Sequence, residues 1–225
     1  TEQHAQVIRL TGSIYQSSLF GELLLLKRTD DLTLTKPRIH IYDEVQNIGD
    51  EPVPFMMLYH CNLGYPMVRA GTELITASEV YPRDAVAQAG LSNWQTYESA
   101  TVGYAEQVFF HHSKMLTGHR DFATVALINK DIGLEFSWDT KTMPYLTQWK
   151  STRQGIYVCG IEPGNCIPEG QNSAREAGRL CVLEPQEKQQ FEFFIEILDG
   201  EDDINRSQNN IKHLREHGEP ISNCE

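Results

Sequence analysis

Two segments of the chain place a group that can move protons directly after an apolar run. His60 follows Met56–Tyr59, just before a Gly-Tyr-Pro turn, and Glu162 follows Tyr157–Ile161, just before Pro163. Proline ends the strand, and the glycine after it lets another group approach closely. Burial next to apolar residues raises a carboxyl pKa toward neutrality, where general acid/base catalysis operates. Each residue is a candidate catalyst, with a structural role in its loop as the alternative.

Two further segments set polar side chains beside aromatic rings. They are Gln148-Trp149-Lys150 and Gly103-Tyr104-Ala105-Glu106-Gln107. Such a mixture suits a sugar, because its CH face stacks on rings and its hydroxyl groups need donors and acceptors. Solvated strand faces also produce such triplets, so neither segment by itself indicates sugar binding.

Other chemistries have less support in the sequence. Neighbouring residues on a strand point to opposite faces, so only one of His111 and His112 can join Glu106 or His60 around a metal, and we expect no metal site. The chain has neither a Gly-x-Ser-x-Gly elbow nor a phosphate-binding glycine loop. An odd number of cysteines without a Cys-x-x-Cys pair is typical of free thiols in a reducing cytoplasm. The five are Cys61, Cys159, Cys166, Cys181 and Cys224, of which Cys166 is the one candidate for reactivity.

The elements that position these residues are mainly β-strands, because β-branched and aromatic residues recur in short runs between Gly, Pro, Asn and Asp. Alternating polar and apolar residues indicate strands with one face on a core, as in a sandwich of antiparallel sheets. The predicted strands are Gln6–Leu10, Leu23–Thr29, Arg38–Gln46, Val53–Asn62, Leu74–Ala77, Glu106–His111, Phe122–Asn129, Gly133–Asp139, Tyr145–Ser151, Gly155–Ile161 and Gln189–Ile197.

Length and charge limit the possible partners. The 225 residues are 40% hydrophobic and carry a formal net charge of −12, which repels nucleic acids and anionic membranes. No apolar run approaches the length of about 20 residues that a membrane-spanning helix needs. We predict one sandwich domain over 1–199. A polar helical or disordered tail over 200–225 carries a sparse apolar stripe of Ile204, Ile211 and Leu214.

Five motifs in order resemble an uncharacterised bacterial branch of the aldose 1-epimerase, or galactose mutarotase-like, family. They lie between about Ser18 and Asp199. The motifs are Leu58-Tyr59-His60-x-Asn62-x-Gly64-Tyr65-Pro66, Tyr81-Pro82-Arg83-Asp84, Gly103-Tyr104-Ala105-Glu106-Gln107-Val108-Phe109, Pro144-Tyr145-Leu146-x-Gln148-Trp149-Lys150 and Gly160-Ile161-Glu162-Pro163-x-Asn165-Cys166.

The resemblance implies a large antiparallel β-sandwich that holds a sugar on a concave sheet face. It implies that Glu162 is the base on the anomeric hydroxyl group and that His60 is the acid on the ring oxygen, with no cofactor. The expected partner is a small sugar, in a cytoplasmic protein for which a monomer and a homodimer both stay open. The candidate hydroxyl-binding residues are Asn62, Glu106, Gln148, Trp149, Lys150 and Asn165.

Two departures from the family pattern concern the N-terminal side. Mutarotases carry a second His, and an Arg that binds the sugar, on an earlier strand, and nothing before His60 matches them. Family members are also longer there, so we expect this chain to be the later two thirds of such a sandwich, with an exposed sheet edge.

Two alternative functions keep the same pocket. One is an isomerase or epimerase for an acidic or modified sugar, which Lys150 would favour because a cation can hold a carboxylate or a sulfonate. The other is a carbohydrate-binding module without catalysis.

Overall fold

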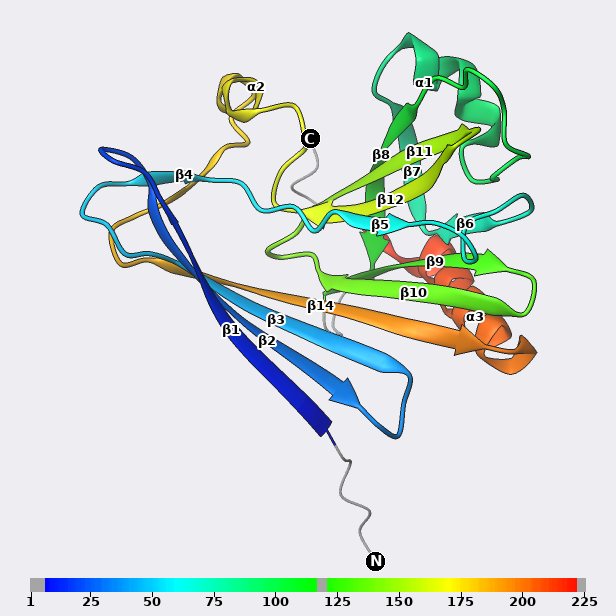
Figure 1. Ribbon diagram of the computed structural model, residues 1–225, viewed down its shortest axis with the longest axis horizontal. Coiled ribbons are helices and arrows are strands. Elements are labelled where there is room, and N and C mark those ends of the chain that lie inside the picture. The colour runs from blue at the N-terminus through cyan, green and yellow to red at the C-terminus, as the bar shows by residue number, and fades with distance from the viewer. Residues whose placement is uncertain (1–6, 117–120, 222–225) are drawn as a thin grey trace, which may run out of the picture.

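The computed structural model describes residues 7–116 and 121–221, which form antiparallel β-sheets with three short or medium-length helices (Figure 1). The predicted all-β sandwich is therefore confirmed. None of the described helices combines the length and the apolar character needed to cross a membrane.

The larger sheet has seven strands, and alternating apolar side chains build its inner face. On its central strand β14, Phe191 and Phe193 are buried in the main core. In spatial order its strands are β1 (Val7–Ser17), β2 (Leu23–Thr33), β3 (Arg38–Asn47), β14 (Lys188–Asp199), β10 (Ile132–Asp139), β9 (Phe122–Asn129) and β6 (Glu73–Thr76).

The smaller sheet covers only the half of the larger one that contains β9 and β10 (Figure 1). Side chains from both sheets, among them Trp138, Phe109 and Ile161, fill the space between them and have no exposed surface. In spatial order its strands are β15 (Glu219–Pro220), β8 (Gln107–Met115), β11 (Tyr145–Arg153), β12 (Ile156–Gly164) and β5 (Cys61–Leu63), and β7 (Ser78–Pro82) also pairs with β8.

Helix α3 (Glu201–His217) packs on the outer face of the larger sheet. The predicted stripe of Ile204, Ile211 and Leu214 is buried there against Ala126 and Leu198. The remaining elements are β4 (Val53–Phe55), which pairs with β13 (Cys181–Leu183), and the helices α1 (Ala85–Gly90), α2 (Gln171–Glu176) and the 3₁₀ turn η1 (Leu91–Asn93).

The predicted strand Val53–Asn62 is wrong in its middle. Its first part is β4 in the two-stranded sheet, and its last part is β5 in the smaller sheet, so the chain between them crosses from one sheet to another. Within this crossing segment, Leu58 forms an isolated antiparallel β-bridge with Gly164. An apolar run predicts that its residues are buried, but it cannot show that its first residues pair with one sheet and its last residues with another.

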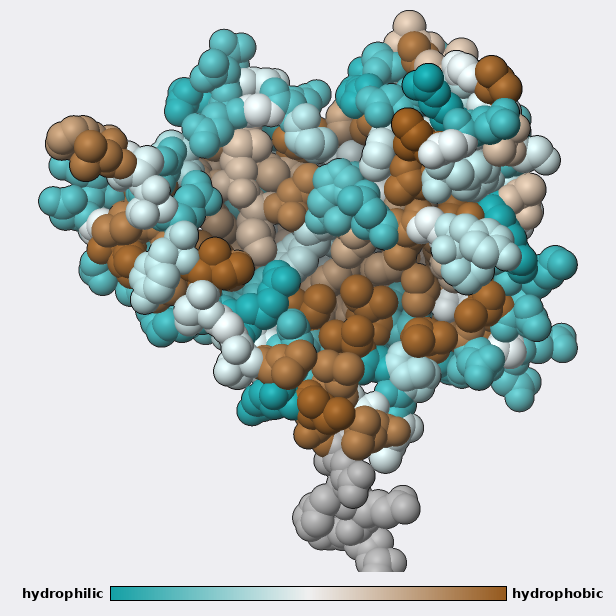
Figure 2. Space-filling model, in the orientation of Figure 1, coloured by the Kyte–Doolittle hydropathy of each residue, from teal (hydrophilic) through white to brown (hydrophobic). Residues whose placement is uncertain are grey.

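The β1–β3 end of the larger sheet extends beyond the smaller sheet (Figure 1). All of β1 is exposed, although it carries Ile8, Leu10, Ile14 and Tyr15, and apolar surface follows it across the face seen in Figure 2. Among the described residues, β1 pairs only with β2, so its other edge is open. The expected exposed sheet edge is thus present.

Candidate active site

A cleft of about 230 Å³ lies on the outer face of the smaller sheet, away from the core. Strand alternation creates it: Ile161 of β12 points into the core, and Glu162 therefore points into the cleft. The volume is below the range of about 300–1,000 Å³ found for drug-sized ligands, and it suits a small molecule. The lining residues are His60, Arg83, Glu106, Val108, Thr147, Trp149, Glu162 and Pro168.

Glu162 is the buried acid of this cleft, with 3% of its surface exposed. Its Oε1 lies 3.1 Å from Nε2 of His60, without the alignment of a hydrogen bond, and has no hydrogen-bond partner among the described residues. Burial raises the pKa of Glu162, and the proximity of His60 offsets part of that rise. A carboxylate with a raised pKa and a free lone pair is suited to accept a proton.

Gly160 makes room for this carboxylate. A Cβ atom at position 160 would lie 2.3 Å from Oε1 of Glu162 and 3.0 Å from Cβ of Trp149, so any side chain would displace one of the two. The glycine therefore belongs to the site as a spacer.

His60 is placed by the residue before it, Tyr59, whose backbone and side chain are both hydrogen-bonded. The N–H of Tyr59 donates to the carbonyl of Pro163, at 2.9 Å, and the Tyr59 hydroxyl donates to buried Asp43, at 2.5 Å. The imidazole itself is half exposed and stands edge-on to Trp149, with ring centroids 5.9 Å apart. The fold thus brings His60 and Glu162 into contact in one cleft, and their catalytic roles stay a prediction.

Thr147 was not predicted, yet it lies directly opposite Glu162 in the pairing of β11 with β12. Its side chain lines the cleft, only 1% of its surface is exposed, and its hydroxyl has no hydrogen-bond partner among the described residues. A buried hydroxyl without a partner costs about 1–3 kcal/mol, so a ligand that bonds to it gains affinity. The signal was available, because Thr147 is two residues before Trp149 and shares its face.

The opposite wall of the cleft comes from β8 and from the segment after β7. Trp149 lies across the floor, and its Nε1 donates to Oε2 of Glu106 at 2.8 Å. Arg83 joins them, from the Tyr-Pro-Arg-Asp motif that carried the resemblance without a functional role. Of the predicted sugar-binding residues, Trp149 and Glu106 are thus at the cleft.

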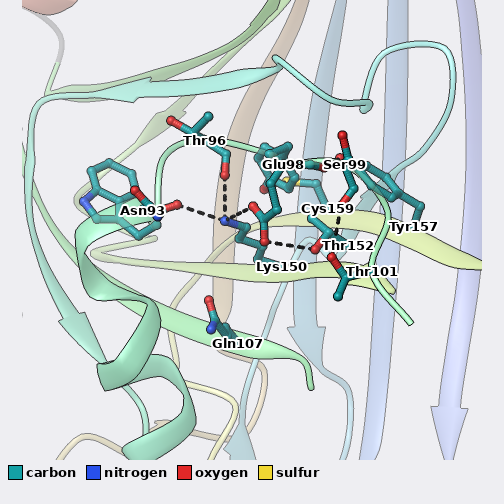
Figure 3. A network of polar contacts seen from close by, with 12 residues as sticks. Asn93, Thr96, Glu98, Ser99, Thr101, Gln107, Lys150, Thr152, Tyr157 and Cys159 are labelled. Carbon is teal, nitrogen blue, oxygen red and sulfur yellow. Dashed lines mark hydrogen bonds and ion pairs between the residues drawn. The ribbon is translucent and has the colours of Figure 1, made fainter. Parts of the chain in front are cut away.

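Gln148 and Lys150 lie outside the cleft, which corrects the prediction that they bind the sugar. They point from β11 into the sandwich, where each has at most 1% of its surface exposed. Lys150 Nζ donates to the carbonyls of Asn93 and Thr96 and pairs with Glu98 at 3.0 Å (Figure 3). Both residues hold the 93–98 segment inside the fold, and Lys150 cannot favour an acidic sugar from there.

Asn165 is likewise a structural residue, contrary to the prediction. Its Oδ1 accepts from the N–H of Met57 at 2.7 Å, and its Nδ2 donates to the carbonyl of Phe55, so it fastens the chain before His60. Asn62 is exposed on β5, opposite Gly160, beside the cleft but outside its lining. Cys166 is buried, and burial raises its pKa to about 11, which disfavours the reactive thiolate.

The described residues hold no cluster of three or more His, Cys, Asp or Glu side chains that could bind a metal ion. His111, one of the residues considered for a metal site, is bonded within the fold: its Nε2 faces Oε1 of Gln148 at 3.3 Å, and its Nδ1 faces the Ser78 hydroxyl at 2.9 Å. Burial lowers its pKa to about 4, so the ring is neutral at pH 7 and serves the core.

Comparison with known proteins identifies the family of this chain. A family model described as a domain of unknown function, DUF4432, matches residues 1–197. The chain belongs to the DUF4432 family. No curated protein matches the sequence.

Solved structures similar to this DUF4432 chain share the sandwich. A Klebsiella pneumoniae protein named as a candidate aldose 1-epimerase is 26% identical, with a TM-score of 0.88 over 93% of this chain and 55% of that one. A galactose mutarotase related enzyme from Lactobacillus acidophilus is 12% identical, with a TM-score of 0.58 over 89% of this chain and 71% of that one. A galactose 1-epimerase from the same species is 15% identical, with a TM-score of 0.55 over 88% and 65%.

These matches confirm the predicted galactose mutarotase-like sandwich. The DUF4432 chain spans about half the length of the Klebsiella protein, 55%, so a relative of this fold contains much that the chain does not.

Thr147→Val tests whether the cleft binds a ligand through the unpartnered hydroxyl. We expect the dissociation constant of a ligand bound in the cleft to rise about three- to tenfold, from the loss of one neutral hydrogen bond worth about 0.5–1.5 kcal/mol. The variant should unfold at the same or a higher temperature, because no bond within the protein is lost. A sugar titration followed by NMR and thermal unfolding measure both, and an unchanged dissociation constant would remove Thr147 from the binding site.

Proposed function

We propose that this protein is an isomerase of the aldose 1-epimerase type, which interconverts the anomers of a sugar. The observation that carries the proposal is the Glu162–His60 contact of 3.1 Å within a cleft that also contains an aromatic ring. A base and an acid side by side can serve the two oxygens bonded to one anomeric carbon.

The chemistry needs two proton transfers. Glu162, as carboxylate, takes the proton of the anomeric hydroxyl group while the C1–O1 bond becomes a carbonyl. The C1–O5 bond breaks with its electron pair going to O5, and His60, as imidazolium, protonates O5. After rotation about C1–C2, O5 attacks the other face of the carbonyl and both protons return, so the reaction consumes nothing and requires no cofactor.

Three features support this proposal besides the dyad. Burial holds the pKa of Glu162 above its usual range, which makes it a stronger base than an exposed carboxylate. Trp149 offers a face for the CH side of a sugar. The fold is shared with proteins named as galactose 1-epimerase and galactose mutarotase related enzyme.

The test is anomer interconversion followed by polarimetry or NMR. Freshly dissolved α-anomers of D-galactose, D-glucose and other free aldoses should equilibrate faster with the protein than in buffer of the same pH. Rates equal to those in buffer for the whole panel would contradict the proposal. Sugar binding without any acceleration would instead support a carbohydrate-binding module.

A further inference from the structure

Arg83 is the one Lys or Arg residue in the described lining of the cleft. Its position is fixed by the sheet, because its backbone N–H donates to the carbonyl of Val108 on β8 at 3.0 Å. Glu162 stands on β12, and β11 lies between β8 and β12. Arg83 follows β7, which pairs with β8 on the side away from β11, so three strand intervals of about 4.8 Å, about 14 Å in all, separate the two backbones. The side chains of Arg83 and Glu162 both reach into the cleft from their walls, and one sugar ring with its substituents can bridge the span between them.

Hydrogen bonds with neighbouring side chains hold the charged groups of Arg83 and Glu106 in place. Nε of Arg83 donates to Oδ2 of Asp84 at 3.0 Å, and the other oxygen of Asp84 caps α1 by accepting from Val86 and Ala87. Glu106 is held through its Oε2 by the indole N–H of Trp149. Neither charged group can turn away from the cleft without losing these bonds.

Arg83 and Glu106 lie close together without a hydrogen bond between them. Nη2 of Arg83 and Oε1 of Glu106 are 3.7 Å apart, too far for a hydrogen bond, and both side chains are partly exposed. A hydroxyl group beside the pair can bridge the two atoms, because its oxygen can accept from the guanidinium and donate to the carboxylate at once. A carboxylate or phosphate on the ligand can only accept, and it would be repelled by Glu106.

We infer that Arg83 is a specificity-determining residue, which together with Glu106 binds one hydroxyl group of an uncharged sugar at the wall opposite Glu162 and disfavours an anionic substituent there. This inference rests on the proposed function, since it takes the anomeric carbon to lie at Glu162.

Arg83→Met keeps the length of the side chain and removes its donors. With a neutral aldose that the wild type turns over, we expect KM to rise about tenfold to a hundredfold, as for the loss of a hydrogen bond to a charged group, while kcat changes less than threefold. Arg153→Met, at an exposed position at the end of β11, is the control and should behave as the wild type.

A series of monodeoxy analogues of the same sugar identifies the hydroxyl group. For the analogue that lacks it, wild type and Arg83→Met should have the same KM, because the interaction is already gone. Replacing that hydroxyl by a carboxylate or phosphate should weaken binding to the wild type at least tenfold, and Glu106→Gln should recover part of this loss because its amide can donate.

Two results would overturn the inference: an unchanged KM of Arg83→Met for neutral sugars, or tighter binding of the anionic analogue by the wild type. If the wild type accelerates no anomerisation, the proposed function fails instead. Sugar binding by NMR titration then still tests Arg83, since the loss of affinity in Arg83→Met does not depend on turnover.

Discussion

Glu162→Gln is expected to lower kcat for anomer interconversion by about 10²–10⁴, the contribution of a positioned general base. The amide has nearly the shape of the carboxyl group, so it leaves the cleft intact, but it cannot accept the proton of the anomeric hydroxyl group. KM should change much less than kcat. Polarimetry at pH 7 measures both, with Glu176→Gln, at an exposed position on α2, as the matched control.

The pH dependence of wild-type activity should also identify Glu162 as the base. Because burial raises the pKa of Glu162, the base becomes protonated at a higher pH than an ordinary carboxyl group would. The acid limb of kcat/KM should therefore lie above the ordinary Glu pKa of about 4.3, and activity should fall as the pH drops through it. Full activity of Glu162→Gln, or an acid limb at or below the ordinary value, would contradict the assignment.

Stability should move in the opposite direction to activity. A carboxyl group with a raised pKa in the folded state stabilises the fold at low pH, and this contribution is lost as the pH rises through that pKa. At pH 7 the wild type therefore bears the cost of a buried charge, and Glu162→Gln should unfold at the same or a higher temperature. A residue kept only to hold the loop would show a loss of stability instead.

Lys150→Met is expected to lower the free energy of unfolding by about 3 kcal/mol, because two carbonyl groups lose their donor at roughly 1–3 kcal/mol each. Those are the carbonyls of Asn93 and Thr96, which Figure 3 shows converging on the ammonium group. Glu98 adds less, since 43% of its side chain is exposed and water can replace the lysine.

Denaturant unfolding measures the loss, and Lys212→Met, on the exposed side of α3, is the control. Where the variant is folded, its KM for a neutral sugar should equal that of the wild type. A stable Lys150→Met protein with weakened sugar binding would place Lys150 in the substrate site after all.

Local patterns predicted most of the strands and the terminal helix. The regions from Phe122 to Asp139 and from Gln189 to Ile197 became strands close to the predicted limits, because each contains β-branched and aromatic residues in short runs bounded by turn residues. β4 and β13 were harder, since a strand of three residues takes its stability from its partner and has too few residues for a periodic pattern.

Sequence alone determined that Glu162 follows a buried apolar run, and that Trp149 points away from Gln148 and Lys150. The expectation that Pro163 ends the strand was wrong, because β12 continues to Gly164. The sequence could not determine which of the two faces of β11 is the cleft. Both faces of β11 are buried, so the residue types on the two faces do not show which face lines the cleft. The interior face is identified by its contact with the 93–98 segment, to which Lys150 is hydrogen-bonded. The tertiary structure therefore decided the site: it brought His60 to Glu162, added Thr147 and Arg83, and removed the lysine.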